Sequence, residues 1–185
     1  MSRVTRSLAA AIAAAAALTP LTQAAEAKKH HPPAVPSKIA VPAGHKVFLV
    51  GHAVGVQIYS CNATAGGFAW ALVAPRANLY NDHGKLLMTH YAGPTWQAKD
   101  GSTVVGSVVD RETVDPTAIP WLLLKAASTA AGPRGDRLTK TAFIQRIATT
   151  GGLAPAAADC NVATAGTRQE IPYTADYYFW KRKGD

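Results

Sequence analysis

Residues 90–109 have the sequence HYAGPTWQAKDGSTVVGSVV, which contains two turns between short apolar segments. A Gly-Pro pair at 93–94 marks the first turn, and KDGS at 99–102 marks a hairpin between residues 95–98 and 103–109. The last segment is rich in valine, which is common in β-strands. The stretch therefore predicts a meander of antiparallel strands. The turns do not require three of its side chains, which are candidates for function: His90, Trp96 and Gln97.

Short segments separated by turn residues continue on both sides of this stretch. We expect strands at residues 46–50, 54–61, 68–74, 85–91 and 173–180, with turns at 51–53 and 81–84. Residues 119–126 and 141–149 fit either a strand or a helix, and we favour strands. The pattern predicts an all-β fold with at most a minor helix. We expect an antiparallel β-sandwich or barrel, in a single domain closed by one disulfide.

Residues 1–27 have the pattern of a signal peptide. Two arginines precede an apolar run at residues 8–18, which is shorter than the roughly 20 residues that span a bilayer. Small residues permit cleavage after Ala24 or after Ala27. We therefore expect a secreted or periplasmic protein with no transmembrane segment after processing. The alternative is an uncleaved N-terminal anchor.

The segment after the signal peptide is rich in proline and poor in apolar side chains. Residues 28–42 are expected to form a flexible leader, and residues 43–185 a single β-rich domain. The two cysteines, Cys61 and Cys160, predict a disulfide, because exported proteins fold in oxidising compartments.

The formal net charge of +8 favours contact with anionic surfaces. Five of the positive charges lie near the ends of the predicted mature chain, at residues 28–29 and 181–183. The interior of the sequence has no stripe of lysine and arginine. We therefore expect no nucleic-acid partner. The oligomeric state is left open.

Several blocks of sequence resemble the exported family catalogued as domain of unknown function 3455. The resemblance covers residues about 41–180, and its blocks include VGHAVGVQIYSC at 50–61, APRANLY at 74–80, HYAGPTW at 90–96, IPWLLL at 119–124 and PYTADYYF at 172–179. It implies a secreted domain of bacteria and fungi with no established activity. Some relatives carry the label malate dehydrogenase. This chain has no G-x-G-x-x-G loop after a strand and no βαβ pattern, so its sequence does not support a dehydrogenase.

The sequence contains no G-x-S-x-G, H-E-x-x-H, P-loop or C-x-x-C motif. We expect no cofactor and no bound metal. An enzymatic hypothesis would use His90 and Asp100 as catalytic residues, or His52 and His90 as metal ligands, if the fold brings them together. We favour hydrogen-bonded structural histidines and an aspartate that caps its turn.

Aromatic and amide side chains supply the ligand-binding candidates, which are Trp96, Gln97, His90, Trp121 and Gln57. Exposed tryptophans would stack on sugar rings with Asn78 and Asp100 as polar partners, whereas buried ones would belong to the core. Polar residues also interrupt apolar runs, as a buried hydrogen-bond network or a ligand pocket would require. These residues are Gln57, Arg76, Gln145 and Arg146.

These features favour a non-enzymatic binding or envelope-associated module for a glycan or an anionic surface. One alternative is a hydrolase or metal-dependent enzyme that uses His52, His90 and Asp100. The other is a structural or stress-exported protein without a small ligand.

Overall fold

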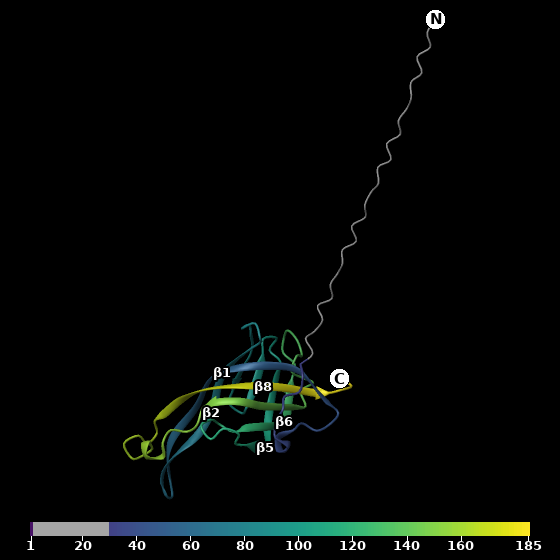
Figure 1. Cartoon of the computed structure of the whole chain (residues 1–185). Helices are drawn as coiled ribbons and strands as arrows, with labels where there is room; N and C mark the ends of the chain where they lie inside the picture. The colour runs from purple at the N-terminus through teal and green to yellow at the C-terminus, as the bar shows by residue number, and fades with distance from the viewer. Residues whose placement is uncertain (2–29) are drawn as a thin grey trace.

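The computed structural model describes Met1 and residues 30–185, so the predicted signal peptide and its cleavage sites lie outside the described residues. Within these residues, eight antiparallel strands form one closed barrel (Figure 1). The strands are β1 (His45–Thr64), β2 (Gly67–Tyr80), β3 (Leu86–Tyr91), β4 (Thr95–Ala98), β5 (Thr103–Glu112), β6 (Trp121–Ala130), β7 (Phe143–Gly151) and β8 (Arg168–Arg182). No helix in the described part of the chain is long and apolar enough to cross a membrane.

The strands follow one another around the barrel in chain order, and β1 closes it by pairing with β8. The expectation of an antiparallel all-β fold is confirmed, and the barrel is the form it takes. The two segments that fitted either a strand or a helix are the strands β6 and β7. The KDGS hairpin joins β4 to β5 as the sequence predicted.

Strand β1 runs without interruption through residues 51–53, so the predicted turn there is wrong. The glycines of this segment serve close packing instead. A Cβ on Gly51 would lie 3.0 Å from the Leu79 side chain, and one on Gly55 would lie 2.2 Å from the Arg76 carbonyl oxygen. Gly55 pairs with Ala77 of β2, so β1 and β2 approach each other closely at this point.

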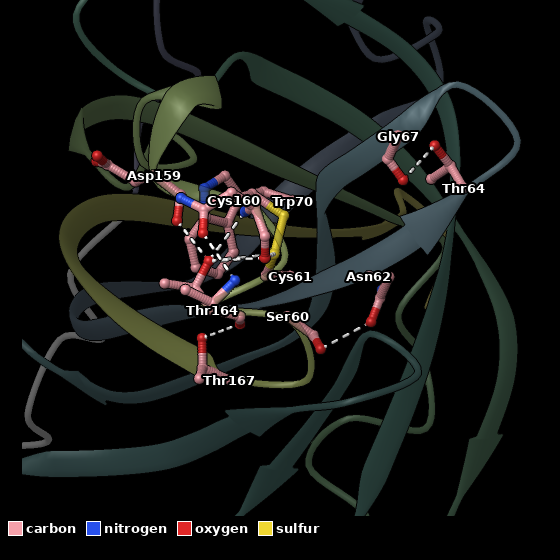
Figure 2. Close-up of a disulfide and its surroundings, with 12 residues drawn as sticks. Ser60, Cys61, Asn62, Thr64, Gly67, Trp70, Asp159, Cys160, Thr164 and Thr167 are labelled. Carbon is pink, nitrogen blue, oxygen red and sulfur yellow. Dashed lines mark hydrogen bonds between the residues drawn. A yellow bond between two sulfur atoms is a disulfide. The ribbon is translucent and has the colours of Figure 1, made fainter.

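Strands β1, β2 and β8 extend beyond the region in which all eight strands pair. Residues 67–76 of β2 and 168–172 of β8 pair with β1 alone among the described strands. The Cys61–Cys160 disulfide confirms the predicted bond and ties this extension to the loop before β8 (Figure 2). Trp70 of β2 donates a hydrogen bond to the Ala156 carbonyl of the same loop at 3.2 Å.

Alternate residues of each strand face the inside of the barrel. In β1, Gln57, Tyr59 and Cys61 are buried while Val54 is exposed, as the two-residue period of a strand requires. The interior holds an apolar cluster with contributions from every strand, including Leu49, Leu79, Met88, Trp96, Val104, Leu124, Ile144, Tyr177 and Phe179.

The end of the predicted flexible leader packs on the outside of the barrel. A 3-10 helix at Ser37–Ile39 buries Ile39 completely, and the Gln145 side chain donates a hydrogen bond to the Ile39 carbonyl at 2.7 Å. Trp180 in turn donates to Gln145 at 2.9 Å. This part of the segment is therefore anchored, because Ile39 covers the outer face beside β7.

Candidate ligand-binding cavity

A cavity of about 250 Å³ lies inside the barrel, beside the turn between β3 and β4. Strand β3 pairs with β2 only over residues 77–80 of β2, and β4 pairs with β5 only over residues 103–105 of β5. Beyond this short hairpin, β2 and β5 continue without a strand between them. The lining residues are Gln57, Leu72, Val73, Ala74, Pro75, His90, Gly93, Pro94, Trp96, Val108, Leu122, Leu124, Arg146 and Tyr177.

His90 and Trp96 form a buried aromatic pair against the cavity. They are register partners on β3 and β4, and their rings stack at a centroid distance of 4.2 Å with planes 8° apart. His90 Nδ1 lies 2.9 Å from the Thr95 carbonyl oxygen. Since a carbonyl only accepts, Nδ1 carries the proton and Nε2 is left as an acceptor. Burial lowers the pKa of His90 to about 3, so the ring is neutral at physiological pH.

Two hydrogen-bond donors on residues that line the cavity have no acceptor among the described residues. They are Gln57 Nε2 and Trp96 Nε1, whose residues are 2% and 1% exposed. Buried donors in folded proteins almost always have a partner. Each such group costs about 1–3 kcal/mol when it is left unpaired. The side chains that line the cavity therefore include two whose N–H groups lack an acceptor and are themselves shielded from solvent.

Arg146 of β7 brings a positive charge to the same cavity. Its Nε and Nη2 both donate to the Pro120 carbonyl, at 3.2 and 2.8 Å, which holds the guanidinium in place. Burial raises the pKa of the neighbouring Tyr177, and the positive charge of Arg146 acts in the opposite direction without outweighing it. The phenol of Tyr177 therefore stays neutral.

The mouth of the cavity is apolar. Leu72 and Val73 of β2 are 55% and 43% exposed, and Val108 of β5 is 43% exposed. All three line the cavity, so they form its rim on the two strands that the short hairpin leaves apart. Exposed aliphatic side chains that surround a cavity are typical of an entrance for an apolar ligand.

The structure brings together three of the five ligand-binding candidates, since Gln57, His90 and Trp96 line this cavity. Gln97 is exposed and alternates with Trp96, so it faces outward. Trp121 is half-buried and also faces away from the cavity. Its neighbour Leu122 lines the cavity, and successive side chains of a strand point to opposite faces.

The residues of the enzymatic hypothesis are not gathered in one site. Asp100 lies at the opposite end of β4, in the KDGS turn. Its carboxylate accepts hydrogen bonds there from the Ser102 hydroxyl and from the backbone N–H of Arg137. His52 lies on the outside of the barrel and contacts Asp176 at 2.7 Å and Asp82 at 3.0 Å. His90, in contrast, faces the interior.

The polar residues that interrupt the strands divide into two groups. Gln57 and Arg146 line the cavity, whereas Gln145 holds the 3-10 helix and Arg76 pairs on the surface with Glu170 at 2.6 Å. Tyr177 lies in the strand predicted at residues 173–180 and was not among the ligand-binding candidates. Its even spacing from Tyr173 along β8 signals a shared inward face, and their hydroxyls lie 3.4 Å apart.

The comparisons with known proteins give one match. The family model described as a protein of unknown function, DUF3455, matches residues 42–181, which include all of the cavity and all eight strands except the last residue of β8. No curated protein and no solved structure is detectably similar to the chain. The chain belongs to the DUF3455 family.

Proposed function

We propose that this protein binds a small, mainly apolar molecule in the barrel cavity, and that the molecule carries hydrogen-bond acceptors. The observation that carries the proposal is a cavity whose lining includes two buried residues, Gln57 and Trp96, with N–H groups that have no acceptor among the described residues. A ligand oxygen that accepts from them would recover the free energy that their burial costs.

The size and lining of the cavity support a small ligand. An eight-stranded barrel is just wide enough to be filled by side chains or to hold one small molecule. The volume of about 250 Å³ is a little below the range of roughly 300–1,000 Å³ for drug-sized ligands. Most lining residues are apolar, and a few polar groups would fix the orientation. This ligand differs from the glycan or anionic surface that the sequence led us to expect, because Trp121 and Gln97 do not line the cavity.

The chemistry of His90 favours binding over acid–base catalysis. A general base works best when its pKa is near the working pH, whereas burial lowers the pKa of His90 to about 3. Asp100, its proposed catalytic partner, does not line the cavity. The disulfide supports the prediction of an exported protein, since such bonds persist in oxidising compartments.

Ligand-observed NMR with small aromatic and aliphatic acids, amides and esters tests the proposal. We expect members of this set to bind the protein and to lose binding in Leu122→Trp, which enlarges a side chain that lines the cavity. The matched control is Leu153→Trp, at an exposed position outside the cavity. Absence of binding throughout the set, or binding that survives in a folded Leu122→Trp protein, would refute the proposal.

A further inference from the structure

Arg146 is the one formally charged side chain that lines the cavity, since His90 is neutral. The ion pairs among residues 30–185 join Lys38 to Asp110 and Glu112, His52 to Asp82 and Asp176, and Arg76 to Glu170. None of these places a carboxylate on Arg146. The cavity therefore has a fixed positive charge that no described acidic side chain neutralises.

The guanidinium is anchored and still has capacity to donate. Arginine has five N–H donors, and the Pro120 carbonyl accounts for two of them. Burial is the largest influence on the pKa values of His90, Tyr59, Tyr173 and Tyr177, and the charge of Arg146 adds a lowering contribution to each. The guanidinium therefore lies among buried neutral side chains, where an added anion would be only weakly screened.

We infer that the ligand is a small monocarboxylic acid whose carboxylate pairs with Arg146 and whose apolar body lies among Leu72, Leu122 and Leu124. This inference rests on the proposed function and names the class of ligand. A carboxylate has two oxygens that accept several hydrogen bonds, which matches the positive charge of Arg146 and the N–H groups that do not bind the Pro120 carbonyl. A single arginine balances a single negative charge, so a doubly charged phosphate would be left undercompensated.

Isosteric pairs of probes test the inference on the unmodified protein. Benzoate and benzamide have the same shape but differ in charge, as do octanoate and octanamide. We expect calorimetry or NMR titration to give tighter binding for the acid in at least one pair, by about 10-fold to 100-fold. That is the range expected when a hydrogen bond involves a charged group.

The variant Arg146→Gln removes the charge and is expected to abolish the preference for the acid while the amide still binds. The matched control, Arg76→Gln, removes the same charge from an exposed position outside the barrel and should keep the preference. Arg146→Lys keeps the charge without the planar fork, and we expect it to retain part of the preference. Thermal unfolding of each variant checks that it folds.

The outcomes separate the inference from the proposed function. If the amide binds at least as tightly as the acid in both pairs, the carboxylate is refuted while binding in the cavity stands. A preference for the acid that persists in a folded Arg146→Gln protein refutes the role of Arg146. If neither member of either pair binds, and the wider set of esters and amides also fails, the proposed function itself is refuted. Should Arg146→Gln fail to fold, the comparison within each pair still decides the question of charge.

Discussion

The imidazole of His90 stacks on the indole of Trp96 at a centroid distance of 4.2 Å, and both rings also meet the Tyr177 ring edge to face. The three side chains come from β4 and from its neighbour β3, and from β8 across the barrel. They form a rigid aromatic wall that carries the unpaired indole N–H. Because aromatic contacts have preferred geometries, this wall fixes the direction of the donor before any ligand arrives.

Acid should destabilise the protein through His90. Burial lowers the pKa of this residue from 6.5 to about 3, so the unfolded state binds a proton that the folded state does not. Its contribution to stability is fully present above pH 6.5 and is lost as the pH falls toward 3, by about 1.4 kcal/mol per pH unit. Urea unfolding at several pH values between 7 and 4 measures this slope. The variant His90→Gln cannot titrate and should show a shallower slope, whereas equal slopes would contradict the prediction.

His52 should act in the opposite direction. Its pKa is raised, mainly by the hydrogen bond to Asp82 and then by that to Asp176. The stabilisation is fully present below pH 6.5 and is lost as the pH rises through the raised pKa of the folded state. We expect the difference in Tm between the native protein and His52→Asn to shrink from pH 6 to pH 9. A difference in Tm that stays constant over this pH range would contradict the prediction.

The strands near turns could be predicted because the residues that set turn geometry are local. The KDGS hairpin is an example, since Asp100 Oδ1 accepts a hydrogen bond from the backbone N–H of Ser102, two residues later. The turn at 51–53 was predicted wrongly because Gly51 is required by a contact with Leu79 on another strand. The sequence could not distinguish a sandwich from a barrel either. The barrel closes through the pairing of β1 with β8, and these two strands lie far apart in the sequence.

The candidate site was predictable in part for the same reason. Gln57, His90 and Trp96 were noticed because polar or aromatic groups in apolar strands need an explanation. Trp121 faces outward because alternation gives the inward position to Leu122. No local pattern could show that β7 brings Arg146 beside Tyr177, its register partner on β8, and so places the charge in the cavity.

The contact between β1 and β2 predicts a sharp difference between two glycines. In Gly55→Ala the new methyl would lie 2.2 Å from the Arg76 carbonyl and 2.5 Å from the Ala77 Cα, both of them backbone atoms that cannot move independently. We expect a loss of at least about 1–3 kcal/mol in the free energy of unfolding. Gly66→Ala, in the hairpin between the same strands, meets no atom within 4 Å and should change stability little. Denaturant unfolding compares them, and equal effects would show that the two strands can separate at this point.

Gln57 and Gln145 are both buried amides, yet their replacement should have opposite effects on the ligand-free protein. Gln57 Nε2 has no acceptor among the described residues, so Gln57→Met removes an unpaired buried donor and should keep or raise the free energy of unfolding, by up to about 1–3 kcal/mol. Gln145→Met breaks the hydrogen bonds to Ile39 and Trp180 and should lower the free energy of unfolding by a similar amount.

The same Gln57→Met variant should bind the acid probes less tightly, because a ligand acceptor has lost its donor. Denaturant unfolding and probe titration measure the two quantities separately. Loss of stability in Gln57→Met with unchanged binding would mean that this amide serves the fold and not a ligand.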